Sequence, residues 1–163
     1  MPSGLYGARV ANCPADATWR VMFSVDDHRR RNADFHLLAM DQKQCFDRLD
    51  LDQLHRVASA TGMPSACLHA LSLYGRLERH LFIDGQPTGY ILSGDGIRGV
   101  PQGCPLACHF CNLTSWLWHL ELQHHLPSVT GISFLDDRLV FTSGDLTLLD
   151  RVLDVTKVVD DYL

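Results

Sequence analysis

The order of the predicted elements indicates an α+β fold, with helices packed on one face of an antiparallel sheet. Residues 35–40 form an apolar run of strand length, the dipeptide Asp84-Gly85 lies between two strand-like runs, and apolar residues recur at alternating steps of four and three over residues 106–120. At 163 residues, 46% of them hydrophobic and 20% charged, the chain has the size of one globular domain with a real core.

The first predicted strand covers residues 35–40. Because the run is mainly apolar and of strand length, we expect it to be buried on both faces, with Asp41 emerging at its end. Asp50 can cap a following helix that Gly62 stops, and a second helix is predicted over residues 64–77. The positions expected to face inward on these helices are Leu51, Leu54, Val57, Ala58, Leu68 and Leu71.

A hairpin and a long helix are predicted next. Asp84-Gly85 favours a tight turn between strands at residues 79–83 and 88–92, and the glycine-rich residues 93–103 follow. Beyond Pro105 an amphipathic helix is expected to run to about His125. Its expected inward positions are Leu106, Phe110, Leu113, Leu117 and Leu120.

The last predicted elements surround the paired aspartates Asp136 and Asp137. Two short strands are expected at residues 131–135 and 138–142, followed by a helix from Asp145. The expected inward positions of this helix are Leu146, Leu149, Val152, Leu153 and Val159.

Apolar runs, cysteines and net charge indicate where the protein is located and what it binds. No apolar run approaches membrane-spanning length and no secretory signal opens the chain, so we expect a soluble, intracellular protein, nuclear or cytoplasmic, without a membrane partner. Six cysteines without an export signal predict reduced thiols and no disulfide-linked partner. The net charge of −5 argues against a free-standing nucleic-acid binder, and the one basic cluster, residues 28–31, is expected to be a solvated loop or helix end.

Three aspartates carry the predicted chemistry. Asp is common in turns, so Asp136 and Asp137 alone would indicate a hairpin turn. Because Asp41 ends a separate apolar strand, however, the fold can bring three carboxylates together, and these repel one another unless cations bind. Carboxylate oxygens suit Mg²⁺, and two such ions about 4 Å apart stabilise the attacking and leaving oxygens of a phosphoryl displacement. The predicted reaction is nucleotidyl transfer.

Four segments resemble the reverse transcriptase domain. Residues 41–47 are similar to the Asp-x-x-x-Ala-Phe-Asp strand of its non-LTR retrotransposon and group II intron branches, with Cys45 in place of Ala. Residues 98–106 resemble the Arg-Gly-x-x-Gln-Gly-x-Pro-Leu turn, and residues 134–137 the aromatic-x-Asp-Asp hairpin. Residues 3–31 are similar to the fingers segment that precedes the catalytic strand. The resemblance implies one partial domain over residues 1–163, with a fingers-like segment at 1–33 and a polymerase palm at 34–163.

The resemblance implies an RNA-directed DNA polymerase that adds deoxynucleoside triphosphates to a DNA primer on an RNA template. Two Mg²⁺ ions, or Mn²⁺, would be held by Asp41 and Asp136 as principal ligands and by Asp137 as a less direct helper. Phe46 would close against a ribose 2′-hydroxyl and thus favour deoxynucleotides. The turn residues that would approach the nucleotide and template are Arg98, Gly99, Gln102 and Gly103. Both glycines are expected at backbone positions that a side chain would obstruct.

Three alternatives stay open. The family's Gly-Leu-x-x-Asn-x-x-Lys block and thumb are not found before Leu163, so the chain can also be an inactive retroelement remnant, at most a binding module. A viral RNA-dependent RNA polymerase shares the carboxylates, but it places Asp where this chain has Phe46 and uses Ser-Gly rather than Pro-Gln-Gly. Cys104, Cys108 and Cys111 have the spacing of a radical S-adenosylmethionine iron–sulfur motif, although on one helix face we expect packing.

Overall fold

The computed structural model describes residues 13–42, 45–92, 97–143 and 145–162, so the first 12 residues of the predicted fingers-like segment lie outside the described residues. The chain divides into two compact units. One consists of Met1–Lys43 with Cys108–Leu163, and the other of Gln44–Ala107. The second unit is therefore an insertion in the sequence of the first.

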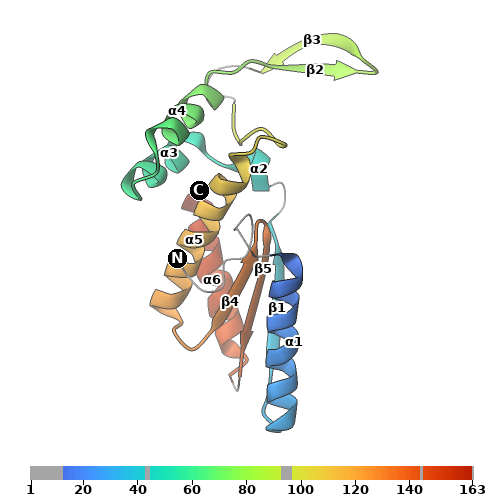
Figure 1. The fold of residues 1–163 in the computed structure, drawn as a ribbon, viewed down its shortest axis with the longest axis vertical. Coiled ribbons are helices and arrows are strands. Elements are labelled where there is room, and N and C mark those ends of the chain that lie inside the picture. Colours follow the sequence, from blue (N-terminus) through green and yellow to red (C-terminus); the bar gives the residue numbers. More distant parts are fainter. Residues whose placement is uncertain (1–12, 43–44, 93–96, 144, 163) are drawn as a thin grey trace. The chain divides into compact units, whose positions relative to one another are not determined.

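The first unit is built on a three-stranded antiparallel sheet of order β1-β5-β4 (Figure 1). Its strands are β1 (His36–Asp41), β4 (Thr130–Phe134) and β5 (Asp137–Thr142). The last strand in the sequence is thus the central one. Asp137 lies opposite Asp41 on one side and opposite Phe134 on the other.

The helices α5 (Ala107–His125) and α6 (Thr147–Tyr162) cover one face of this sheet. Trp118 is fully buried in their shared core, together with Val140 of β5 and Val152 of α6. The predicted α+β class with an antiparallel sheet is confirmed, because helices of 19 and 16 residues pack against antiparallel strands.

A third helix, α1 (Pro14–Arg30), covers part of the other face. Its Ala17 is buried in a small core with Ile132 and Phe141. The basic residues at the end of the helix lie in its last turn and Arg29 and Arg30 are exposed, which confirms the expected solvated helix end.

The prediction that the first strand is buried on both faces is wrong. In β1, His36, Leu38 and Met40 are half-buried, whereas the alternate positions are exposed, Leu37 to 46%. The reason is that β1 is an edge strand of the sheet and α1 covers the second face only in part.

The inner face of α5 is predicted only in part. Phe110 and Leu113 are buried as expected, but Leu120 is 39% exposed and Trp118 is the residue that enters the core. An apolar pattern misses this face because it includes polar residues buried through hydrogen bonds, such as Ser115, whose hydroxyl donates to the Leu135 carbonyl at 2.9 Å.

The inner face of α6 departs from the prediction for the same reason. Val152 and Val159 are buried as expected, whereas Leu146 and Leu153 are exposed. Thr156 lies in the buried stripe instead, where its hydroxyl accepts the indole N–H of Trp118 at 2.9 Å.

The second unit contains three short helices and a hairpin. They are α2 (Cys45–Arg48), α3 (Leu51–Ala60), α4 (Ser65–Tyr74), β2 (Arg79–Ile83) and β3 (Gln86–Leu92). Asp50 caps α3 as predicted, since its carboxylate accepts the backbone N–H groups of Asp52 and Gln53, both at 3.0 Å. All four predicted inward residues of α3 are buried. Asp84 and Gly85 have φ angles of 48° and 75°, the positive values that a tight hairpin turn requires.

Among the helices of the described ranges, none combines the length and the apolar character needed to cross a membrane.

Candidate active site

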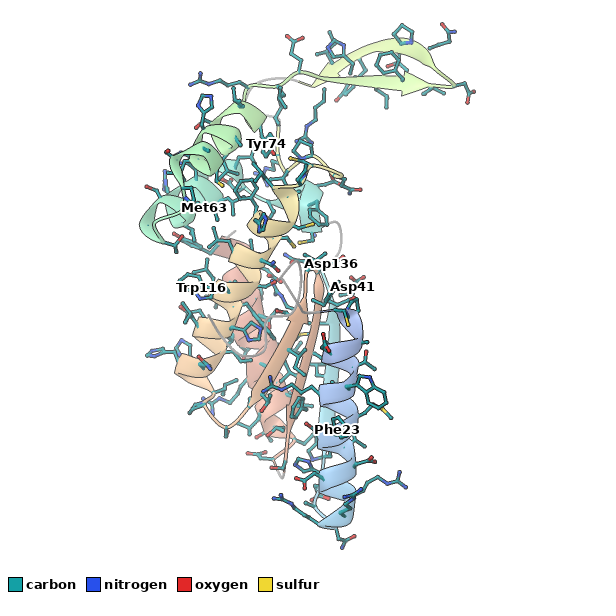
Figure 2. All side chains as sticks on the ribbon, viewed as in Figure 1. Phe23, Asp41, Met63, Tyr74, Trp116 and Asp136 are labelled. Atoms are coloured by element: carbon teal, nitrogen blue, oxygen red, sulfur yellow. The ribbon has the colours of Figure 1, made fainter. Side chains whose placement is uncertain are left out.

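Two of the predicted carboxylates face each other across neighbouring strands. Asp41 and Asp137 form the last register pair between β1 and β5, and the Cβ atoms of such opposite residues lie about 4.5–5.5 Å apart. Both side chains are exposed. Figure 2 shows Asp41 and Asp136 at the same end of the sheet, where β1 ends and the β4–β5 hairpin turns.

The hairpin turn that carries Asp136 consists of Leu135 and Asp136. Leu135 has a φ angle of 55° while Asp136 does not have a positive φ, which is the pattern of a type II′ turn. A non-glycine residue in this region persists where the surrounding structure holds it. Here Ser115 of α5, fully buried, donates to the Leu135 carbonyl and fixes the turn. The half-buried Asp136 is therefore presented from an anchored turn.

A cleft of about 400 Å³ lies beside the carboxylate pair. It is lined by Asp41 and Asp137, by apolar side chains of the same sheet face and by the first turn of α1. These other lining residues include Ala17, Ala39, Ile132, Phe134 and Leu139. Apart from the two carboxylates and Arg138, which also lines it, the cleft is mainly apolar.

The carboxylate pair fits a hard divalent cation. Like charges directly opposite each other in a sheet repel, and a cation between them removes that repulsion. Mg²⁺ commonly takes one or two carboxylates and completes its shell with water and phosphate oxygens, so Asp41 and Asp137 are a sufficient protein contribution. Over the described ranges, however, no group of three or more His, Cys, Asp or Glu side chains is arranged to hold a metal. The structure therefore pairs two carboxylates and does not gather all three predicted ligands into one cluster.

The remaining predicted site residues belong to the second unit, where Gly99 joins the predicted turn to α2. Gly99 donates its N–H to the Leu49 carbonyl at 2.8 Å, and Val100 donates to the Phe46 carbonyl at 2.7 Å. Gly99 and Gly103 have φ angles of 75° and 85°, which confirms that a side chain would be unfavourable at both positions. Phe46 itself is half-buried.

Side chains reinforce this turn. The Gln102 amide donates to the Asp47 carboxylate at 3.3 Å, and Arg79 donates to the Gly99 carbonyl at 2.8 Å. Arg98 is exposed. Arg79 and Gln102 line an open cleft of about 550 Å³ that also includes Pro101. The structure thus brings the predicted residues Phe46, Gly99 and Gln102 together. Arg79 also contacts this turn, and no sequence motif indicated it.

The turn ends at a hydrogen-bonded thiol. The Tyr74 hydroxyl and the Cys104 Sγ lie 2.7 Å apart. This hydrogen bond, helped by the backbone N–H groups of Leu106 and Ala107, lowers the pKa of the Cys104 thiol from its ordinary 9.0. Burial, followed by the bond to Cys104, raises the pKa of Tyr74 to about 12. Cys111 is buried, and the absence of a metal-holding group among the described cysteines lends no support to the iron–sulfur alternative.

Sequence reasoning missed a buried arginine behind the carboxylates. Arg138 is only 2% exposed, and its guanidinium donates to Asp160 at 2.9 Å and to the Gln42 side chain at 3.3 Å. The signal was present in β5, because Arg138 occupies the same inward-facing series as Val140 and Thr142.

Comparisons with known proteins point to one family. The family described as "Reverse transcriptase (RNA-dependent DNA polymerase)" matches residues 7–160. Among solved structures, the chain is similar to a telomerase from Candida albicans in complex with a fragment of telomeric RNA, with a TM-score of 0.58 and 15% identity over 93% of this chain. It is also similar to an apo telomerase from Candida tropicalis truncated from its C-terminal domain, with a TM-score of 0.52 and 16% identity over 89% of this chain. The chain spans 29% and 31% of those two telomerase chains. No curated protein sequence matches it.

Proposed function

Because the chain belongs to the reverse transcriptase family, we propose that it forms the catalytic palm of an RNA-directed DNA polymerase. The observation that carries the proposal is the pairing of Asp41 with Asp137 at the end of the sheet, directly after the anchored turn that presents Asp136. The block at residues 41–47 favours a polymerase of the non-LTR retrotransposon and group II intron type. The family match favours this reading over a viral RNA polymerase.

In this proposal Asp41, Asp136 and Asp137 hold two Mg²⁺ ions, or Mn²⁺ in their place. When bound, the ions would stabilise the attacking 3′-hydroxyl and the leaving pyrophosphate oxygens. The protein contributes fixed carboxylates: ladder pairing sets the position of Asp41 and Asp137, and the hydrogen bond from Ser115 sets the turn of Asp136.

The turn of the second unit would handle the nucleotide and template. Phe46 would contact the sugar and disfavour a 2′-hydroxyl, while Arg98, Gln102 and the backbone at Gly99 and Gly103 would approach the nucleotide and template. The hydrogen bonds from Val100 to the Phe46 carbonyl and from Gln102 to Asp47 support a common role, because they hold the turn against α2.

The proposed partners are an RNA template, a DNA primer and deoxynucleoside triphosphates. The similarity to a telomerase that was solved with an RNA fragment supports the choice of RNA. The net charge of −5 predicts that this chain alone binds a template weakly, because affinity for a phosphate backbone comes mainly from Lys and Arg.

Primer extension on an RNA template tests the proposal. The isolated chain should polymerise poorly or not at all, so the assay uses the chain extended by the family's lysine block and thumb. The extended protein should incorporate deoxynucleotides only with Mg²⁺ or Mn²⁺, and Asp136→Asn should reduce the rate by about 100-fold or more, the loss typical of removing one electrostatic stabiliser. Asp84→Asn is the matched control, since Asp84 also occupies a hairpin tip and Asn tolerates its φ angle of 48°. A folded protein that incorporates nothing, or that works equally well as Asp136→Asn, would support the inactive remnant instead.

Sugar selection provides a second test. Phe46→Ala should raise the incorporation of ribonucleotides relative to deoxynucleotides, because the ring that excludes a 2′-hydroxyl is removed. Phe82→Ala, which truncates an aromatic residue that is 58% exposed on β2, should leave the ratio unchanged. An unchanged ratio in Phe46→Ala would assign Phe46 to packing alone.

A further inference from the structure

We infer that Arg138 is a positioning residue that keeps Asp41 opposite Asp137, by tying the end of β1 and helix α6 to β5. The inference rests on the proposed function, because it concerns the carboxylate pair proposed to bind metal. Arg138 follows Asp137 in β5 and points to the sheet face opposite the carboxylates.

The guanidinium of Arg138 makes two directed contacts at its far end. Nη1 donates to the Asp160 carboxylate of α6 at 2.9 Å, and Nη2 donates to the Gln42 side-chain oxygen at 3.3 Å. The ring of Trp118 lies under the guanidinium carbon at 5.2 Å from its centroid, which adds a cation–π contact. One side chain of β5 therefore contacts α5, α6 and Gln42, the residue directly after β1.

The contact with Gln42 is the one that concerns the site. Gln42 is the residue directly after Asp41, where the ladder between β1 and β5 has ended. Strand ends open most readily, because no further ladder pair follows. Arg138 pairs with Met40 in the ladder, and its side chain reaches Gln42, one residue beyond Asp41. This side-chain bond thus restrains the strand end that carries the carboxylate.

Because Arg138 is buried, a contribution to stability alone is a poor explanation for its presence at this position. Arg138 is 2% exposed, and its Nε has no hydrogen-bond partner within the described residues. The ion pair is buried only at its Arg138 end, because the Asp160 side chain is 35% exposed. A charge taken out of water recovers its lost hydration only with good geometry, and an apolar residue of similar volume often replaces a buried charge without loss of stability. A planar donor with two ends is instead suited to fixing geometry, since it holds Gln42 and Asp160 at set positions.

Site-resolved hydrogen exchange on the 163-residue chain tests the positioning role without any metal. Gln42→Ala removes the acceptor at the strand end, and Asp160→Ala removes both the acceptor and the charge on α6. Both should speed exchange of ladder amides near Asp41 and Asp137 by about tenfold, the factor expected for losing a hydrogen bond to a charged group. At the far end of the same ladder, at His36 and Thr142, the amide exchange rates should stay within about a factor of two of the unmutated chain. Overall loosening would speed both ends equally.

The controls use neighbouring and conservative changes. Asp161→Asn alters the exposed residue beside Asp160 and should leave exchange unchanged. Gln42→Glu keeps an acceptor oxygen for Arg138, so exchange at the strand end should stay slow, unlike in Gln42→Ala. Unchanged exchange in Gln42→Ala, equal acceleration at both ends, or the same effect from Asp161→Asn would each overturn the inference.

A titration with Mn²⁺ alone, followed by electron paramagnetic resonance, separates this inference from the proposed function. Binding that disappears in Asp41→Asn supports the proposed metal site, and Gln42→Ala should then weaken Mn²⁺ binding several-fold. Full Mn²⁺ affinity in Gln42→Ala would overturn the role of Arg138 at the site. If no binding depends on Asp41, the proposed function fails at its metal, while the exchange experiment still decides whether Arg138 positions the strand ends.

Discussion

Replacing Gly99 by alanine tests how closely the predicted nucleotide-binding turn lies against α2. A Cβ atom on Gly99 would lie 2.5 Å from the Asp47 Cα and closer still to the Phe46 carbonyl oxygen. Both are backbone atoms, so no flexible side chain can move aside. Gly99→Ala must therefore shift the backbone and weaken the bonds from Gly99 to Leu49 and from Val100 to Phe46.

The structure supplies a matched control four residues further on. Gly103 has a similar positive φ angle, 85° against 75°, but no atom lies within 4 Å of a Cβ built on it. Gly103→Ala should lower the free energy of unfolding by about 1–2 kcal/mol, which is the cost of placing alanine in the left-handed conformation. Gly99→Ala adds an overpacking cost of about 1–3 kcal/mol, which gives about 2–5 kcal/mol in all. The lower backbone entropy of alanine in the unfolded chain affects both variants alike and cancels in the comparison.

Urea unfolding followed by far-ultraviolet circular dichroism measures the two free energies of unfolding. Gly99→Ala should lower the unfolding midpoint clearly more than Gly103→Ala does. Equal losses, or a larger loss in Gly103→Ala, would refute the close approach between Gly99 and α2.

Three further predictions concern other parts of the chain. Gly131→Ala should lower the free energy of unfolding by about 1–3 kcal/mol, because the added Cβ would lie 2.7 Å from Leu122 where β4 approaches α5. Tyr74→Phe should slow the alkylation of Cys104 by iodoacetamide near neutral pH, because loss of the hydroxyl raises the pKa of the thiol and lowers its thiolate fraction. Asp145→Asn should make the free energy of unfolding fall less steeply as pH is lowered into the acid range. The hydrogen bonds at the start of α6 lower the pKa of Asp145, so its contribution is present above the ordinary value of 3.8 and is lost as pH falls through the folded value.

Each of these predictions has a result that contradicts it. Wild-type stability in Gly131→Ala would mean that β4 and α5 are not in close contact. Unchanged alkylation of Cys104 in Tyr74→Phe, with mass spectrometry resolving Cys104 from the exposed Cys13, would assign the thiol's acidity to another cause. An acid limb that keeps its slope in Asp145→Asn would show that the cap does not contribute.

The sequence predicted those elements whose cause is local. The cap of α3, the apolar stripe of that helix and the positive φ angles at Asp84 and Gly85 are all set within about ten residues, and all are observed. Helix α1 was not predicted as a helix because its pattern is not amphipathic: Trp19 and Phe23 are 59% and 67% exposed.

The features that could not be predicted depend on the order of the strands. The burial of β1 follows from its place at the edge of the sheet, which no spacing in the sequence reveals. The role of Arg138 depends on Gln42 and Asp160, which lie 96 and 22 positions away. For the candidate site, the strand end at Asp41 and the hairpin turn at Asp136 and Asp137 indicated the carboxylates, and the resemblance added their roles. The pairing of Asp41 with Asp137 rather than with Asp136 required the register.

The strand order also constrains how this protein can assemble. The central strand β5 is the last of the sheet to be synthesised, and the contact between Gln42 and Arg138 spans 96 positions. Until β5 emerges from the ribosome, β1 has no hydrogen-bonding partner within the sheet, while the inserted unit of Gln44–Ala107 is already complete. Such non-local pairing is slow to form, and an unpaired apolar strand can associate with other chains in the meantime. The carboxylate pair should therefore be among the last features to form, so a chain that stalls during folding would not bring Asp41 opposite Asp137.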